Sequence, residues 1–268
     1  LASLTINGTT EVIEPERCRD HTEIMMSYLG LDVKREKFDL NGKLAAKTSY
    51  RGLQEFDAKD FHVPGDISSA AFLIVAALLV KDSKILIKNV GINPLRDGII
   101  TTLIEMGGNI ALQNKRLMGG EDVADILVES SDLKGVDVPE DRAPIMIDEY
   151  PILAVAAANA SGRTKMNGLA ELKVKESNRL LMIAQNLENC GVTLKMGDDF
   201  LEVEGGIAQP SSLVKIHTSM DHRIAMSFLV MGLMLENGVE IDDASMIATS
   251  FPNFEALFED FGCGFEVG

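Results

Sequence analysis

The sequence predicts an α+β fold built from repeated βα units, because three long segments follow one pattern. Each segment opens with an aspartate, continues into an apolar run of helix length, and ends 41 or 43 residues later at a glycine. The segments run from Asp66 to Gly107, from Asp148 to Gly191 and from Asp221 to Gly262. Self-similarity at a nearly fixed period is typical of an architecture in which one structural unit repeats.

The first helix of each unit is predicted to be buried. The runs Ala70–Val80, Ile152–Ala158 and Ile224–Leu235 are apolar on every side, which is typical of a helix inside the core. Aspartate is a preferred N-cap, and Pro151 suits a first helical turn, where its missing N–H has no partner anyway. We therefore expect the three aspartates to occupy equivalent positions at three helix N-termini.

A short strand and a second helix follow each buried helix. The strands are predicted over Lys84–Asn89, Arg163–Asn167 and Val239–Asp242. The second helices have an amphipathic pattern and are predicted over Gly98–Met106, Leu180–Leu187 and Phe254–Phe261. After the closing glycine a further strand is predicted, as over Val192–Lys195 and Phe265–Val267.

The start of the chain repeats the second half of this unit. A strand is predicted over Thr10–Ile13, a helix over His21–Leu29 that ends at Gly30, and another strand over Leu31–Lys34. The chain therefore holds three units and the tail of a fourth.

The predicted domain boundary lies near Pro64. Residues 1–63 are interpreted as the last unit of a first globule, and residues 64–268 as a second globule. The first residue is leucine, and Leu1–Leu4 is typical of the end of a helix. We therefore expect the chain to begin inside a larger protein.

Composition limits the classes of partner. Among 268 residues, 25 Lys and Arg face 41 Asp and Glu, which gives a formal net charge of −16. Such an acidic chain has few basic residues with which to build a nucleic-acid-binding face or a surface that binds anionic lipid. The longest apolar run has 11 residues, below the about 18 needed for a membrane span.

The cysteines predict neither a disulfide framework nor a zinc site. Cys18, Cys190 and Cys263 are few and scattered, and the chain opens without a signal-peptide pattern. We expect a cytoplasmic protein. No phosphate-loop, dinucleotide or metal-ligand spacing occurs in the sequence, so neither a metal nor a cofactor is expected.

A basic cluster stands out from the acidic background at Lys175, Glu176 and Arg179. Two cations at a helix N-terminus form a credible phosphate or carboxylate site, although an ordinary solvated helix start would contain the same residue types. Arg223 opens a wholly apolar helix, where it either binds an anion or pairs with an acidic neighbour. Asp148 is either a functional carboxylate or an N-cap with no further role.

The repeat brings these candidates together. Equivalent helices point the same way, so their N-termini are expected to converge and to add their partial positive charges in one region. Arg19 extends this set, because it precedes Gly30 by 11 residues, as Arg96 precedes Gly107. An acidic protein could bind an anionic ligand at such a place.

Four stretches of the sequence resemble the EPSP synthase family, in order and over almost the whole chain: Asp148–Ala154, Val174–Leu180, Asp221–Met226 and Ser250–Pro252. The resemblance implies two globules of repeated βαβαββ units with buried parallel helices and a cleft between them. It also implies a transferase of the shikimate pathway, which leads to aromatic amino acids. Its substrates are phosphoenolpyruvate and shikimate 3-phosphate, it needs no cofactor, and members are expected to be monomers.

The resemblance also implies residue roles. Asp148 accepts a proton from the shikimate hydroxyl, and Glu176 handles the proton at the enolpyruvyl methylene. Lys175 and, less directly, Arg19 bind shikimate 3-phosphate. Arg179 and Arg223 hold phosphoenolpyruvate.

The departures from the family pattern matter as well. The family's N-terminal substrate-binding stretches are absent, so we expect this chain alone to have little or no turnover. Thr249 stands where many members have lysine. Two alternatives stay open: another enolpyruvyl transferase that uses a different anionic alcohol, and a binding module that has lost catalysis.

Overall fold

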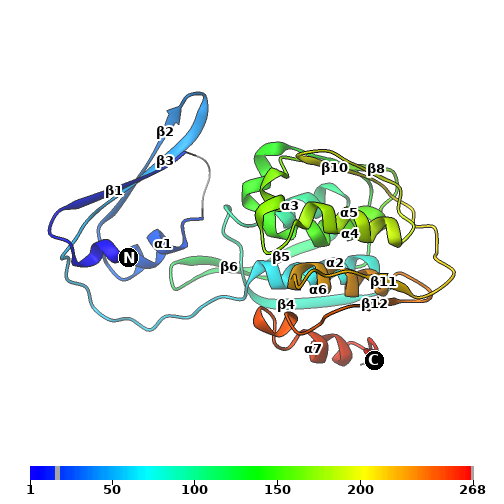
Figure 1. Ribbon diagram of the computed structural model, residues 1–268. Coiled ribbons are helices and arrows are strands. Elements are labelled where there is room, and N and C mark those ends of the chain that lie inside the picture. Colours follow the sequence, from blue (N-terminus) through cyan, green and yellow to red (C-terminus); the bar gives the residue numbers. More distant parts are fainter. Residues whose placement is uncertain (16–18, 267–268) are drawn as a thin grey trace.

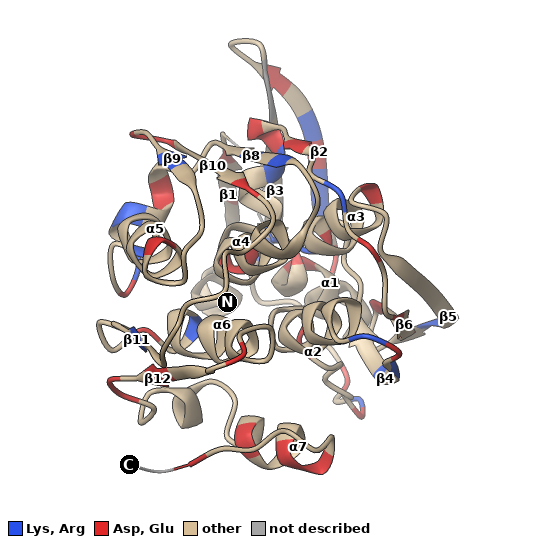
Figure 2. Cartoon of the chain, turned by 90° about the vertical axis from the view of Figure 1, so that its right-hand side faces the viewer, with Lys and Arg blue, Asp and Glu red and all other residues tan. Residues whose placement is uncertain are grey.

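Three almost wholly apolar helices form the centre of the larger part of the structure. They are α2 (Ile67–Leu79), α4 (Tyr150–Asn159) and α6 (His222–Gly232). The computed structural model describes residues 1–15 and 19–266. Figure 2 looks roughly along the three helices, which pack against one another in pairs. The prediction of buried helices is confirmed, because most of their residues lie in the hydrophobic core.

Four further helices among the described residues each end two residues before a glycine. They are α1 (His21–Tyr28), α3 (Gly98–Glu105), α5 (Arg179–Asn189) and α7 (Phe254–Asp260). The glycine that follows each one has a left-handed backbone, with φ between 80° and 95°. At Gly107 the N–H bonds to Ile104 O, and the next N–H bonds to Leu103 O, so the last carbonyls of α3 are satisfied. The predicted helix ends are therefore confirmed.

Each unit begins with a parallel pairing around its buried helix. Gly65 forms a bridge with Val90 of β4 (Lys84–Gly91). In the second unit β7 (Asp137–Val138) pairs with β8 (Arg163–Asn167), and in the third β11 (Val214–Ile216) pairs with β12 (Val239–Ile241). This common arrangement places the three helix N-termini on the same side of the molecule.

An antiparallel hairpin completes each of the first two units. It consists of β5 (Asn109–Met118) with β6 (Glu121–Glu129), and of β9 (Leu194–Met196) with β10 (Phe200–Glu204). The resulting sheet orders are β4-β6-β5 and β7-β8-β10-β9. The alternation of helices and sheets confirms the predicted α+β class.

Three predicted strands are displaced or missing. The strand expected over Leu31–Lys34 begins at Val33, because the Leu31 N–H still bonds to Met26 O at the end of α1. The strand expected over Val192–Lys195 begins two residues later, because the Val192 N–H still bonds to Leu187 O at the end of α5. The strand expected over Phe265–Val267 is wrong for its first two residues, which are irregular; Val267 lies outside the described residues. Phe265 instead packs against Phe254 at a ring distance of 6.4 Å.

The smaller part has a sheet and a hydrophobic cluster of its own. It contains a short 3-10 helix at Ala2–Thr5 and the strands β1 (Thr9–Glu14), β2 (Val33–Leu40) and β3 (Lys43–Arg51), paired in the order β1-β3-β2. Met26, Leu31 and Tyr50 form its buried cluster. An extended segment joins it to the larger part (Figure 1). The division at residues 63 and 64 stays a prediction.

Consecutive residues at the start of α1 connect the two parts. Asn93 donates from Nδ2 to Asp20 Oδ1 at 2.8 Å, and His21 Nδ1 lies 2.6 Å from Glu121 Oε1. A cavity of about 420 Å³ opens beside these contacts, with His21, Arg96 and Glu121 in its lining. The contacts hold Arg19, the preceding residue, against the larger part.

Asp125 on β6 holds two irregularities of its sheet in place. The register shifts between Ile87 and Val90 on β4 and between Gln113 and Arg116 on β5. Asp125 accepts hydrogen bonds from Asn114 Nδ2 and from the Asn89 N–H, both at 2.9 Å. Those bonds, together with Arg116, lower the pKa of Asp125 from 3.8 to about 2.

Replacing Asp125 by asparagine is expected to lower the free energy of unfolding near neutral pH. The folded pKa lies below the unfolded value of 3.8, so the contribution of the carboxylate is present above 3.8 and is lost as pH falls toward 2. Urea unfolding at several pH values should therefore show a gap between D125N and the unchanged chain that narrows on acidification. D122N, an exposed neighbour on β6, is the control. A gap that stays constant down to pH 2 would contradict the argument.

Candidate active site

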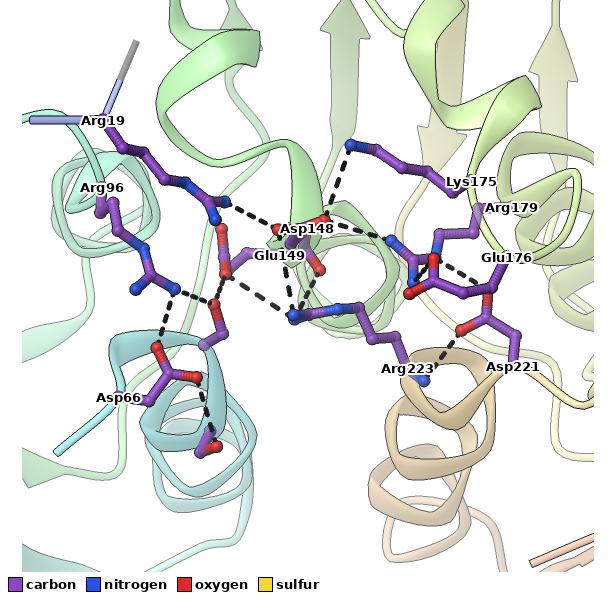
Figure 3. A network of polar contacts seen from close by, with 12 residues as sticks. Arg19, Asp66, Arg96, Asp148, Glu149, Lys175, Glu176, Arg179, Asp221 and Arg223 are labelled. Carbon is purple, nitrogen blue, oxygen red and sulfur yellow. Dashed lines mark hydrogen bonds and ion pairs between the residues drawn. The ribbon is translucent and has the colours of Figure 1, made fainter. Parts of the chain in front are cut away.

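The N-termini of the three buried helices meet in one polar network (Figure 3). Asp66, Glu149 and Asp221 are the N-caps of α2, α4 and α6. Side chains at neighbouring helix N-termini contact one another. Ser68 of α2 donates to Glu149, and Arg223 of α6 lies 3.9 Å from a carboxylate oxygen of Glu149. The predicted convergence of helix N-termini is confirmed, and with it the concentration of positive helix ends.

Asp148 differs from the other two aspartates. It lies inside a 3-10 turn, Ile147–Glu149, and the N-cap of α4 is Glu149. The prediction that Asp148 is an N-cap is therefore wrong, because the extra turn moves the helix start one residue along the chain. Pro151 occupies the first turn of α4 as expected. The Asp148 carboxylate is thus free to face side chains from other elements.

Four cations surround the Asp148 carboxylate. Arg19 Nη2 donates to Oδ2 at 2.7 Å, and Arg179 Nη1 donates to Oδ1 at 3.2 Å. Lys175 Nζ and Arg223 Nη2 each lie 3.9 Å from one of its oxygens. Burial acts to raise the pKa of Asp148, but the charges of Arg223, Arg19 and Lys175 and the bond from Arg19 outweigh it and hold the pKa at about 2. Asp148 is therefore ionised at neutral pH.

Arg179 is the buried centre of the network. Its side chain is 1% exposed, and besides Asp148 it bonds through Nε to Asp221 Oδ2 at 2.8 Å and through Nη2 to Glu176. Asp221 is also buried and accepts from Ser177 Oγ and from the Arg223 N–H. One guanidinium thus links the N-terminal ends of α4, α5 and α6.

Lys175 and Glu176 lie in the loop before α5, which begins at Arg179 with Asn178 as its N-cap. Lys175 therefore lies outside the helix that Arg179 begins, although both side chains reach Asp148. Lys175 is also paired with Glu171. The Glu176 side chain is 52% exposed, so part of its carboxylate faces open space.

The structure brings all six predicted site residues into one network. Sequence reasoning missed Ser68, Arg96 and Glu149, which extend the network to α2. Arg96 was visible only as the counterpart of Arg19 before its own glycine. Thr249 lies outside the network, and its hydroxyl donates to Met246 O in its own turn, so it adds no cation.

The described residues contain no cluster of His, Cys, Asp and Glu suited to a metal ion. Cys190 is buried and Cys263 is partly buried, and Cys18 lies outside the described residues. No described helix has the length and apolar character needed to cross a membrane.

Arg179 provides a stability test of the network. In R179M the buried Asp221 loses its guanidinium partner, and we expect the free energy of unfolding to fall by about 3–5 kcal/mol, as when one partner of a buried ion pair is removed. R163M is the matched control. Arg163 also bonds two carboxylates, those of Asp137 and Glu202, but is 43% exposed, so its loss is expected to cost less than about 1 kcal/mol. Equal losses in urea unfolding of the two variants would contradict the central role of Arg179.

The sequence of this chain is similar to those of known proteins. The family model described as EPSP synthase (3-phosphoshikimate 1-carboxyvinyltransferase) matches residues 1–258. A Rhizobium johnstonii protein named 3-phosphoshikimate 1-carboxyvinyltransferase is 52% identical over an alignment of 272 positions. The alignment covers 100% of this chain and 59% of the relative. A protein of the same name from Bartonella henselae is 52% identical over 263 residues, 98% of this chain and 59% of the relative.

Solved structures show the same similarity. An EPSP synthase from Acinetobacter baumannii superposes with a TM-score of 0.87 at 40% identity, over 97% of this chain and 58% of the other. The enolpyruvyl transferase NikO from Streptomyces tendae superposes with a TM-score of 0.72 at 19% identity, over 98% of this chain and 57% of the other, which shows a shared fold. The chain spans about 59% of the length of the curated relatives it matches.

Proposed function

The chain belongs to the EPSP synthase family, and on that premise we propose that it supplies catalytic residues to the transfer of an enolpyruvyl group from phosphoenolpyruvate to the 5-hydroxyl of shikimate 3-phosphate, with release of phosphate. The observation that carries the proposal is one ionised carboxylate, Asp148, surrounded by four cations from separate segments. This arrangement combines a proton acceptor with binding groups for several anions.

The cations provide for two anionic substrates. Phosphoenolpyruvate and shikimate 3-phosphate repel each other, so bringing them together requires fixed positive charge. We assign Lys175 and Arg19 to shikimate 3-phosphate, and Arg223 and Arg179 to phosphoenolpyruvate. Arg179 is buried, so its contact with substrate depends on movement of the half-exposed Glu176, which holds its Nη2.

Substrate binding also activates Asp148. A carboxylate whose pKa is about 2 is a weak base, and a general base works best with a pKa near the operating pH. When substrate phosphates and the substrate carboxylate take Arg19, Lys175 and Arg223 as partners, Asp148 loses the charges that lower its pKa. Its basicity then rises at the moment when the shikimate hydroxyl arrives.

The reaction proceeds by addition and elimination. Asp148 takes the proton of the attacking hydroxyl while the new C–O bond forms, and Glu176 gives a proton to the methylene carbon, which leaves a tetrahedral ketal. Glu176 then removes a proton from the resulting methyl group as phosphate departs, and Asp148 returns its proton to the leaving group. Atoms and protons balance through these two residues, so the proposal assigns no cofactor.

The setting of the enzyme follows the same proposal. We infer that the enzyme works in the cytoplasm, where a biosynthetic enzyme of the shikimate pathway meets its substrates, and that it works as a monomer. Size-exclusion chromatography with light scattering tests whether the enzyme is a monomer. A measured mass twice that of one polypeptide would contradict this inference.

The catalytic proposal is tested in a hybrid enzyme in which this chain replaces the matching stretch of the Rhizobium johnstonii relative. We expect the hybrid to turn over both substrates and the isolated 268-residue chain to do so slowly or not at all. In the hybrid, D148N is expected to lower kcat about 10²–10⁴-fold, the usual contribution of a general base. D137N, which alters an exposed aspartate outside the site, is the control.

The outcomes separate the alternatives. A folded hybrid without turnover would contradict the proposed reaction, and unchanged kcat in D148N would contradict the role of Asp148. Calorimetric titration of the hybrid with shikimate 3-phosphate distinguishes the other transferase, since no heat of binding would favour a different anionic alcohol.

A further inference from the structure

A buried glutamate that the mechanism leaves unused lies beside the site. The Glu149 side chain is 3% exposed and accepts a hydrogen bond from Ser68 Oγ. Arg96 Nη2 in turn donates to Ser68 Oγ at 2.8 Å and to Asp66 Oδ1 at 2.7 Å. A polar chain therefore runs from Arg96 through Ser68 to the Glu149 carboxylate, and hydrogen bonds in such chains strengthen one another.

The Arg223 guanidinium lies between this carboxylate and Asp148 (Figure 3). Its Nη1 is 3.9 Å from Glu149 Oε1, and its Nη2 is 3.9 Å from Asp148 Oδ2. Nη1 also donates to the Asp148 carbonyl oxygen at 3.4 Å. Both carboxylates are close enough to attract the guanidinium but too far to form hydrogen bonds with it. The ion pairs thus orient Arg223 while leaving N–H groups to donate to a ligand.

The two neighbours of Arg223 differ in what they do when substrates bind. Asp148 is shared among four cations, and in the proposed reaction it gains and loses a proton. Glu149 is 3% exposed and takes no part in those proton transfers. Burial raises the pKa of Glu149 above its usual value, although the bond from Ser68 and the charge of Arg223 act against this rise. The nearby guanidinium thus favours the charged form of Glu149, and the charged carboxylate in turn attracts the guanidinium.

We propose that Glu149, held by Ser68 and Arg96, is a positioning residue that directs the Arg223 guanidinium toward phosphoenolpyruvate. The inference rests on the proposed function, because it assumes that Arg223 binds that substrate. The proposal gives the N-terminal end of α2 an indirect role in binding. Among the described contacts, no residue of α2 reaches Asp148.

The test is the variant E149Q in the hybrid enzyme. Glutamine keeps the size of the side chain and can still accept the bond from Ser68, but it removes the charge. We expect KM for phosphoenolpyruvate to rise about tenfold, as for the loss of one interaction with a charged group, and KM for shikimate 3-phosphate to change less than about twofold. A general loss of structure would instead raise both KM values and lower the urea midpoint.

A milder pair of variants covers the case in which E149Q folds poorly. S68A removes the hydroxyl that holds Glu149, and we expect KM for phosphoenolpyruvate to rise about threefold, less than for loss of the charge itself. S227A is the matched control, because Ser227 is also a buried serine in a core helix and its hydroxyl has no partner among the described residues. We expect S227A to leave both KM values unchanged.

A double-mutant cycle shows whether Glu149 acts through Arg223. Adding E149Q to R223K is expected to change KM for phosphoenolpyruvate by less than about twofold, because the group that Glu149 directs is already altered. Equal effects of E149Q on KM in the two backgrounds would overturn the inference, as would unchanged KM in both folded E149Q and S68A. A hybrid that is inactive with Glu149 in place would instead contradict the proposed function itself.

Discussion

Three apolar helices lie in the core of this protein with their N-termini together, so positive helix ends and the side chains of Arg179 and Arg223 gather where little water reaches. A buried charge is costly unless it is paired and hydrogen-bonded. The network meets this requirement by alternating signs, in the order Asp66, Arg96, Glu149, Arg223, Asp148, Arg179 and Asp221. Ser68 bridges Arg96 and Glu149 by hydrogen bonds. The rest of the larger part is arranged so that these groups meet.

The same alternation supports the proposal that this acidic chain binds anions. In that proposal, carboxylates hold each cation in place before a ligand arrives, and the ligand then replaces a carboxylate as the partner of the cation. Lys175 is a clear case, since it lies between Glu171 and Asp148. In the proposed reaction the exchange also links binding to chemistry, because every cation that leaves Asp148 for a substrate makes Asp148 a stronger base.

Among the described residues of the smaller part, Arg19 is the one whose side chain bonds to Asp148. Arg19 reaches Asp148 across the junction between the two parts. The neighbouring Asp20 and His21 contact Asn93 and Glu121 of the larger part and so fix the position of Arg19. The geometry of the site therefore depends on how the two parts are held together, and also on the N-terminal ends of the helices in the larger part.

The sequence by itself determined the repeat, the buried and amphipathic helices, and the glycines at which helices end. These features depend on neighbouring residues, through side-chain periodicity and the backbone freedom of glycine. It also singled out all six residues of the candidate site, five of them beside predicted helix starts and Arg19 through its spacing from Gly30.

Only the tertiary structure decided which groups meet and in what state. A 3-10 turn made Glu149 the N-cap and released Asp148, and Arg179 became a buried centre with three carboxylate partners. Glu149 and Ser68 are 81 positions apart, and Asp148 and Arg223 are 75 apart. No local pattern records such contacts, because they arise from the packing of helices that belong to different units.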